Sequence, residues 1–313
     1  MDSIPKVTSI SFSSDDGGLS DPRLAKILGR LTELSVNHSY NPRDLFRWPD
    51  SLSLQSPWMS EELLSVHGSH YAKSLTSQQT IYLSHWELIN FFSFSVHGIC
   101  DLISRILEVV PRRGTTPISD YLHHFIDEEN KHLWFFTNFC NRYGRKIYPT
   151  CKFPMHYTEA DTVEEFVIFS RILITESIGD FFNVRMARDT HLPKIVRDIN
   201  AMHHRDETRH IAMGSIVVDR LLKSARKNWS DEVSQQVAHS LGKYMQYSVE
   251  CLYNVRAYGD ANLPNNYAIR RALLNDPARI DFHLQVLDRS IRFFASRGLP
   301  VMKSFCWRRN AQS

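Results

Sequence analysis

The sequence predicts an all-α protein built on a bundle of four long helices. Long segments repeat apolar side chains at the i, i+3, i+4 and i+7 spacing of a helix, and no segment of useful length alternates as a strand does. Proline, glycine and capping residues separate these segments. At 313 residues, the chain can bury a large core. We therefore expect a four-helix bundle with additional N- and C-terminal helices.

The four long helices are expected over residues 76–110, 117–144, 161–190 and 193–225. Pro111 closes the first helix, Pro117 begins the second and Pro193 begins the fourth, as the lack of a proline amide proton favours. These helices form the expected core bundle, which covers about residues 76–222.

Shorter elements are expected on both sides of the bundle. Residues 1–20 form a flexible lead-in, and residues 21–313 form a single domain. The expected short helices follow Pro22, begin at Ser60, and cover 231–257, 266–275 and 278–297. Residues 38–58 and 145–160 are expected to be loops, and 258–266 a turn.

Composition excludes several classes of protein. Hydrophobic content of 42% and charged content of 23% are typical of a globular domain, and a net charge of +3 does not favour nucleic-acid binding. The most apolar stretch, residues 89–107, is interrupted by polar residues, so we expect no membrane span. No secretory signal is visible, and five scattered cysteines indicate reduced thiols, so the expected location is the cytoplasm.

One octapeptide, residues 203–210 (HHRDETRH), carries the strongest chemical signal. His203, Glu207 and His210 fall within an arc of roughly 60° on a helix. The same face continues as apolar residues and should point into the core. His204 lies about 120° from His210, so we expect His204 to pack or to contact the surface.

The other three long helices also place polar residues on their inner faces. The first has Glu87, the second has Glu129 and His132 as a Glu-x-x-His pair, and the third has Glu176. In chain order the helices read Glu, Glu-x-x-His, Glu, Glu-x-x-His, which is the ligand pattern of ferritin-like two-metal proteins. Four buried carboxylates without cations would be very costly, so satisfied core glutamates are a poor explanation.

This set of side chains predicts a site for two iron ions. Carboxylates neutralise and bridge the ions, and imidazoles complete the coordination while positions stay open for dioxygen. Manganese in place of iron remains an alternative, because carboxylate-rich sites bind both.

Acidic residues next to the predicted ligands are expected to orient the histidines. Glu128 precedes Glu129 and Asp206 precedes Glu207, where each acid can accept a hydrogen bond from the outer nitrogen of a ligating imidazole. Asp180 lies one turn from Glu176 and is either a similar support or part of an ordinary ion pair.

At these positions the sequence resembles the di-iron arylamine N-oxygenase family, which includes the p-aminobenzoate N-oxygenase of aureothin biosynthesis and the oxygenase that forms the nitro group of chloramphenicol. The distinguishing feature is the additional histidine of His-x-x-x-Glu-x-x-His, matched by His203, Glu207 and His210. The resemblance covers about residues 76–222 and assigns the other ligands to Glu87, Glu129, His132 and Glu176. No motif indicates the substrate-binding residues.

The resemblance implies an enzyme that uses dioxygen and external electrons to oxygenate an amine nitrogen to a hydroxylamine, nitroso or nitro product, in the biosynthesis of an antibiotic or another secondary metabolite. It implies a small-molecule amine substrate, free or bound to a carrier protein, a reductase or ferredoxin as electron donor, and a homodimer.

Two alternatives stay open. A related di-iron hydroxylase or desaturase that acts on carbon in a carrier-bound acyl or aminoacyl group would share the scaffold and most ligands. A non-catalytic, iron-binding ferritin-like protein is the second, although this chain is much longer than a minimal bundle.

Overall fold

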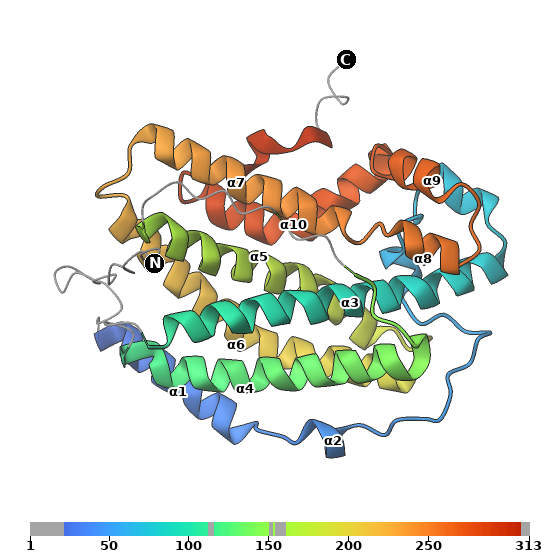
Figure 1. Ribbon diagram of the computed structural model, residues 1–313, viewed down its shortest axis with the longest axis horizontal. Coiled ribbons are helices and arrows are strands. Elements are labelled where there is room, and N and C mark those ends of the chain that lie inside the picture. Colours follow the sequence, from blue (N-terminus) through green and yellow to red (C-terminus); the bar gives the residue numbers. More distant parts are fainter. Residues whose placement is uncertain (1–21, 112–115, 150–152, 154–160, 308–313) are drawn as a thin grey trace, which may run out of the picture.

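The computed structural model describes residues 22–111, 116–149, 153 and 161–307. Four long helices form its centre: α3 (Ser77–Val109), α4 (Thr116–Phe139), α5 (Asp161–Arg188) and α6 (Lys194–Ala225). Figure 1 shows them packed side by side. The described part of the chain contains helices and connecting segments without strands. The all-α prediction and the four-helix core are therefore confirmed.

Helices α3 and α4 run antiparallel, and specific contacts fix how far along each other they pack. Thr76 and Gln79 form a capping box at the start of α3. Cys140, in the π-helical turn η3 (Cys140–Gly144) that follows α4, lies against the first half of α3, with its Sγ 3.8 Å from the Ile89 carbonyl oxygen. Gly144 allows this close approach, because a Cβ at this position would lie 2.7 Å from Cδ1 of Ile89 unless that side chain moved.

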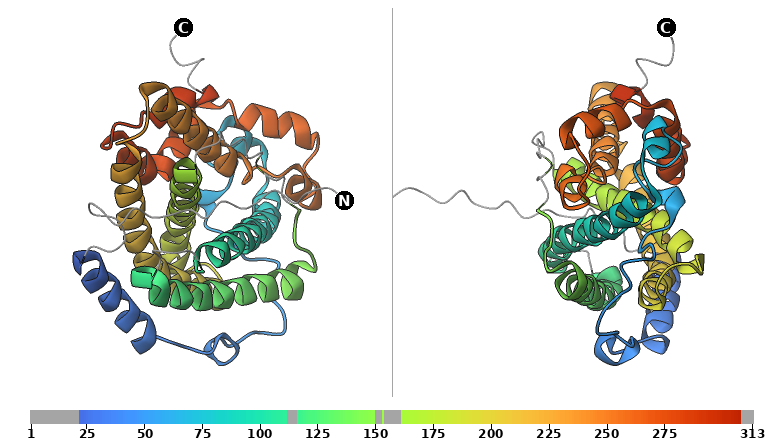
Figure 2. Two further views of the ribbon diagram at one scale, coloured as in Figure 1. Left: turned by 60° about the vertical axis from the view of Figure 1, so that its left-hand side comes forward. Right: turned by 90° about the vertical axis from the view of Figure 1, so that its right-hand side faces the viewer.

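Two further layers cover the bundle on opposite sides, as Figure 2 shows. On one side, α1 (Pro22–Asn37) packs on α4 and α6, and α2 (Pro42–Leu45) packs on α4. The other side carries α7 (Asp231–Glu250), α8 (Val255–Asp260), α9 (Asn266–Leu273) and α10 (Pro277–Ala295). Of these, α7 and α10 pack on α5, and α8 packs on α3. The expected additional helices are thus present.

Two local predictions are corrected. The helix expected over 231–257 ends at Glu250, and α8 covers the last three residues of that expected helix and the first three of the turn expected over 258–266. The reason is Asn254, whose backbone is extended and whose side chain caps α8 by accepting from the Arg256 amide. The segment 38–58 is irregular as expected but contains α2, and the short helix expected at Ser60 is the 3-10 turn η1 (Glu61–Leu63).

One contiguous set of buried apolar side chains extends from Leu28 to Trp307. Inside it, α4 and α6 bury charged residues that are almost fully inaccessible, and Glu129, His132, Asp206 and Glu207 each have 0% exposure. No described helix has the length and apolar character needed to cross a membrane. The polar residues at the centre of the apolar core are the candidate site.

Candidate metal centre

Six of the seven predicted ligands lie together in the middle of the bundle. They form two groups whose ligand atoms lie within 4.8 Å of one another: Glu129, His132, Glu207 and His210 in the first, and Glu176, His203 and Glu207 in the second. All six are buried and come from α4, α5 and α6. Glu207 belongs to both groups, so its carboxylate is placed between the two positions.

Distances around the Glu207 carboxylate show how closely the imidazoles approach. Its Oε1 lies 2.9 Å from Nε2 of His203 and 3.5 Å from Nδ1 of both His132 and His210. Nδ1 of His210 also lies 2.7 Å from Oε1 of Glu129. His132 and His210 therefore present Nδ1 to the centre, whereas His203 presents Nε2.

Burial and the neighbouring charges shift the pKa values of the cluster residues in different directions. Burial raises the pKa of Glu176 well above its usual range, and the Glu207 and Glu129 carboxylates raise it further. Burial also opposes ionisation of Glu207, but the nearby His203 and His210 lower its pKa well below the usual range. Burial lowers the pKa of His132, yet Glu129 reverses this and raises it to about 9. In the metal-free cluster, protons offset part of the negative charge.

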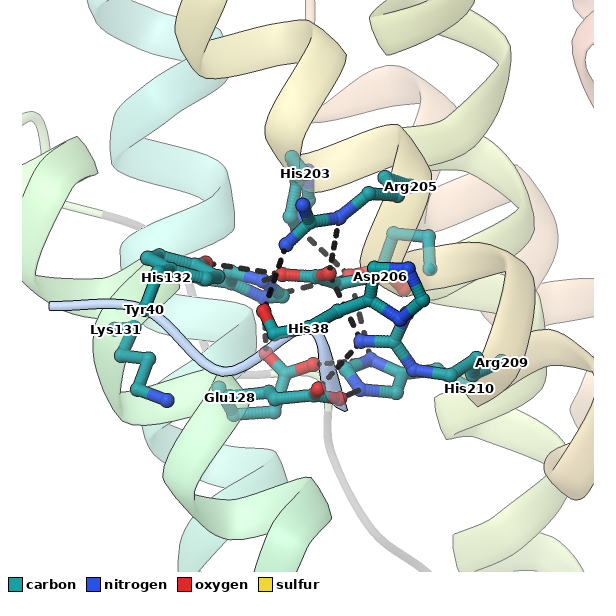
Figure 3. A network of polar contacts seen from close by, with 12 residues as sticks. His38, Tyr40, Glu128, Lys131, His132, His203, Arg205, Asp206, Arg209 and His210 are labelled. Atoms are coloured by element: carbon teal, nitrogen blue, oxygen red, sulfur yellow. Dashed lines mark hydrogen bonds and ion pairs between the residues drawn. The ribbon is translucent and has the colours of Figure 1, made fainter. Parts of the chain in front are cut away.

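The outer nitrogens of His132 and His210 are held by the predicted acids in a crossed arrangement (Figure 3). Nε2 of His210 on α6 donates to Glu128 of α4 at 2.9 Å. Nε2 of His132 on α4 donates to Asp206 of α6 at 3.2 Å. Each helix therefore orients the imidazole of the other, which fixes the nitrogen that faces the centre.

Arg209 joins these two acids. Its guanidinium donates to Asp206 at 2.9 Å and also to Glu128, and its side chain is 7% exposed. Around the cluster the sequence contains the same five-residue pattern twice, as EENKH at 128–132 and as DETRH at 206–210. The pattern is an acidic residue, Glu, any residue, a basic residue and His. The base of the first copy, Lys131, pairs with Asp127 nearer the surface, so the two copies are not equivalent.

The end of α1 and the segment that follows it cover this network from outside. Tyr40 donates to Asp206 at 2.9 Å, on the same oxygen that accepts from His132. Ser35 accepts from Arg209 at 3.1 Å, and the His38 carbonyl accepts from Arg205 at 3.2 Å. Sequence reasoning missed these residues, because no periodic pattern connects a segment at 35–40 with helices more than eighty residues away.

Asn183 is a second contact that sequence reasoning missed. Its side-chain amide lies 2.5 Å from Nδ1 of His203, the outer nitrogen of that ring, and Asn183 is fully buried. A signal was present, because Asn183 follows Glu176 by seven residues and therefore lies on the same face of α5. The third imidazole is thus oriented by an amide, where the other two are oriented by carboxylates.

The inner atoms of the cluster fit a pair of metal ions. Seven of its buried atoms make no hydrogen bond of acceptable geometry, although several lie within ion-pair distance of one another: both carboxylate oxygens of Glu129 and of Glu207, Nδ1 of His132, Nε2 of His203 and Nδ1 of His210. Buried polar atoms are almost always satisfied, so a converging set of unsatisfied ones indicates a missing partner. Oxygen and imidazole donors in this number suit divalent iron or manganese.

Comparison with known proteins agrees with this geometry. The family model described as p-aminobenzoate N-oxygenase AurF matches residues 21–298. The chain belongs to the AurF family. The resemblance stated from the ligand spacing is therefore confirmed, and with it the oxygenase class of this protein. No curated protein matches the sequence.

The fold of this AurF-family chain is similar to solved structures of R2-like ligand-binding oxidases. One variant with an aerobically reconstituted Mn/Fe cofactor has 16% sequence identity and a TM-score of 0.50, over 85% of this chain and 93% of that chain. Another such variant has 16% identity and a TM-score of 0.49, over 88% and 94% of the two chains. At this identity the likeness concerns the fold alone.

Glu87 is the predicted ligand that the structure does not bring to the AurF-family cluster. Its carboxylate accepts from the backbone amide of Ser65 at 2.8 Å and from the Ser65 hydroxyl, and Arg279 and Tyr258 lie nearby. Periodicity gave the wrong height along the helix. Ile89, which follows Glu87 by two residues, packs beside Gly144. Gly144 follows Glu129 by fifteen residues, which is roughly 22 Å along a helix, so Glu87 lies at the level of Gly144 and far from Glu129.

Asp180 also lies apart from the six grouped residues. It accepts from Nδ1 of His204 at 2.5 Å and from Arg289 of α10 at 3.2 Å. It therefore joins α5, α6 and α10 in an ion cluster near the surface and contacts none of the three inner imidazoles through a described hydrogen bond. Of the two interpretations left open by the sequence, the structure favours the ion pair.

Proposed function

We propose that this protein is a two-metal oxygenase that transfers oxygen from dioxygen to the nitrogen of a small-molecule amine. The observation that carries the proposal is the converging set of unsatisfied inner atoms on five of the six grouped side chains, whose two groups share Glu207, in a chain of the AurF family. We assign Glu129, His132, Glu176, His203, Glu207 and His210 as the metal ligands. Two iron ions are the proposed cofactor, with manganese substitution at either position.

The reduced metal pair, when bound, supplies the electrons and open coordination positions that dioxygen activation requires. The chain's own residues hold the imidazoles in one orientation through Glu128, Asp206 and Asn183. Aromatic rings restrict the access of water. Phe125 packs on His210 with ring centroids 4.5 Å apart, and Phe136 packs on His203 at 4.9 Å. A dry, preorganised site of this kind suits a reactive oxidant.

The third histidine favours nitrogen over carbon as the atom oxidised. His203 lies in the cluster, as the arylamine N-oxygenase motif requires, and a separate side chain, Asn183, orients it. A site that only stored iron would have no need to fix a third imidazole in this way. A carbon hydroxylase or desaturase remains the competing function, and the products distinguish the two.

The finer biological setting is also part of the proposal. We place the protein in the cytoplasm as a homodimer that receives electrons from a reductase or ferredoxin and acts in secondary metabolism on an amine that is free or carried on a protein. The four cysteines within the described chain are free thiols, which supports a reducing compartment.

Metal content and product mass test the function. We expect about two iron ions per chain after anaerobic loading, and an absorption change when dioxygen meets the reduced protein. With p-aminobenzoate as the first probe and isotopically labelled dioxygen, the product should carry the label on nitrogen. Label on carbon would favour the hydroxylase, and the absence of bound metal would remove the proposal.

A further inference from the structure

A short hydrogen-bond route joins the cluster to the surface of the molecule on the side of α1 and α2. Nε2 of His132 donates to the Asp206 carboxylate, which also accepts from Tyr40 and from Arg205 (Figure 3). The side chain of Arg205 is 38% exposed, and the carbonyl that accepts from it belongs to the exposed His38. Two hydrogen bonds therefore separate an inner imidazole from residues at the surface.

The opposite side of the bundle is covered by a further layer of helices. There α7 and α10 pack on α5, and α8 packs on α3. On the near side the chain between α1 and α2 lies directly over Asp206, because Tyr40 donates to this carboxylate at 2.9 Å. A redox partner that docks on the α1–α2 side therefore has the shorter approach to the metal positions.

The layer of α1 and α2 also exposes a large share of the apolar side chains at the surface. Of the eight large hydrophobic residues exposed in the described chain, five lie within residues 27–54. These five are Ile27, Leu34, Val36, Leu45 and Leu54. Ile27 and Leu34 lie two turns apart on one face of α1. Exposed apolar residues that are concentrated in one layer indicate an interaction surface.

The same layer carries more unpaired positive charge than negative charge. Four of its basic residues are exposed and have no ion-pair partner among the described residues: Lys26, Arg30, Arg43 and Arg47. Two exposed acids, Glu33 and Asp44, have no described basic partner either, whereas Asp50 is paired with Arg142. The excess of unpaired bases suits an acidic partner.

We infer that a small acidic electron-carrier protein docks on the α1–α2 layer and passes electrons to the cluster along Tyr40, Asp206 and His132. The inference rests on the proposed two-metal function and names the class and the docking site of its electron donor. Each reduced carrier gives up one electron, and two carriers in turn bring two trivalent metal ions to the divalent state. The acids of the carrier pair with the exposed bases around an apolar centre. Electron-transfer encounters bury little area, so they need no deep groove.

The binding of an oxidised, acidic plant-type [2Fe–2S] ferredoxin to the whole metal-free protein tests the docking site by isothermal titration calorimetry. The affinity should fall about tenfold or more between about 20 mM and about 200 mM sodium chloride, because opposite charges drive the encounter. Arg43→Glu and Arg47→Glu should each weaken binding about threefold or more. Arg271→Glu is the matched control, since Arg271 of α9 is exposed and has no ion pair in the described chain. It should bind as the natural protein does.

The rate at which reduced ferredoxin reduces the iron-loaded protein without oxygen tests the route. Tyr40→Phe breaks the route after docking, so it should lower the maximal rate severalfold and leave the half-saturating ferredoxin concentration unchanged. Arg43→Glu should raise that concentration instead. Tyr82→Phe, at an exposed tyrosine of α3, should change neither quantity. Competition against a chelator confirms that Tyr40→Phe still holds its iron, and circular dichroism melting confirms that each variant is folded.

Ferredoxin binding that is absent, that ignores salt, or that Arg271→Glu weakens as much as Arg43→Glu would overturn the inference. An unchanged maximal rate in Tyr40→Phe would contradict the route. A dimer of this chain that Val36→Asp dissociates in sedimentation velocity would also overturn the inference, because a second copy would then cover the surface. Loss of all iron binding would instead contradict the proposed function, while ferredoxin binding to the metal-free protein would still be measurable, so the two failures are distinguishable.

Discussion

Arg209 joins the two acids, Glu128 and Asp206, that surround the cluster of predicted ligands. It is the buried base between Glu128 and Asp206, and those two acids hold the histidines of both motif copies. Burial lowers the pKa of Arg209, but the adjacent Glu128 and Asp206 carboxylates outweigh burial and raise it, so Arg209 remains a cation. No sequence rule identified Arg209, because its role depends on a contact from α6 to α4.

Replacing Arg209 should therefore cost much more than replacing its counterpart. Arg209→Met removes the buried cation that Glu128 and Asp206 share, and we expect about 3–5 kcal/mol less free energy of unfolding. Lys131→Met, at the matching place of the other motif copy, should cost at most about 1 kcal/mol, since its ion pair with the more exposed Asp127 lies near the surface. Urea unfolding of the metal-free proteins measures both, and equal losses would contradict this assignment.

Asp206 should matter for metal binding through His132. Asp206→Asn removes the charged acceptor that orients this ring, and we expect a loss of about 10- to 100-fold in metal affinity. Tyr40→Phe removes only a neutral donor to the same carboxylate, so its effect should be smaller. Competition against a chromogenic chelator gives the affinities. Unchanged affinity in Asp206→Asn would mean that His132 is held by packing alone.

The residues of the site were predictable to the extent that they share one helix face. Spacing of three, four and seven residues identified the ligands of α4 and α6, because helical geometry alone places them together. Glu87 satisfied the same rule on its own helix. Its height relative to α4 depends on how Ile89 packs beside Gly144, and a pattern within one segment carries no such information.

At the scale of elements, the C-terminal layer depends on a close approach between α7 and the 3-10 turn η4 (Val301–Ser304). Gly242 of α7 faces this turn, and a Cβ on it would lie 2.3 Å from the Val301 carbonyl oxygen. Because that oxygen belongs to the backbone, the turn can make room only by moving away from α7.

Gly242→Ala should separate these two elements. We expect a loss of about 1–3 kcal/mol, as for other overpacked sites, in spite of the higher helix propensity of alanine. Gly29→Ala in α1 is the matched control, since nothing lies within 4 Å of the added methyl group. The control should gain about 0.5–1 kcal/mol. Thermal unfolding measures the stability of both variants. If Gly242→Ala were more stable than the natural protein, η4 would have moved to accommodate the added methyl group.

Most elements could be predicted because their apolar periodicity is strong and proline or glycine marks their ends. The segment from Cys251 to Asp260 could not be predicted in detail. It contains a break and a short helix whose start is set by the Asn254 cap, and Asn90 of α3 accepts a hydrogen bond from the same side chain at 2.8 Å. Such tertiary contacts override a weak local pattern.

At the scale of the whole molecule, Glu87 connects three layers. It accepts from Ser65 in the segment before α3, Ser65 accepts from Tyr258 of α8 at 2.9 Å, and Arg279 of α10 donates to the His67 carbonyl at 2.8 Å. Glu87, Ser65 and Arg279 line a small pocket of about 20 Å³. The residue that the sequence assigned to the metal cluster thus joins the bundle to the segments around it.

Glu87 should make global stability depend on pH. Burial raises the pKa of Glu87 from 4.5 to about 7 against the opposing hydrogen bonds of Ser65. A carboxyl group with a raised pKa contributes stability that is complete below pH 4.5 and is lost as the pH rises through 7.

Relative to Glu87→Gln, the metal-free protein should therefore lose about 2–3 kcal/mol of unfolding free energy between pH 5 and pH 8. Subtracting the unfolding free energy of the variant from that of the natural protein at each pH removes the contributions of groups that the substitution leaves unchanged. Urea titrations at both values measure the difference. Parallel pH profiles of the two proteins would show that Glu87 ionises normally in the folded state.

The crossed hydrogen bonds between α4 and α6 also have a genetic consequence. A substitution of Glu128 removes the hydrogen bond that orients His210, and a substitution of Asp206 removes the one that orients His132. In each case the affected histidine lies on the other helix. Second-site suppressors of a damaged acid should therefore map to the helix that did not carry the original mutation. The effects of substitutions in the two motif copies would then depend on each other, although about seventy residues of chain separate the copies.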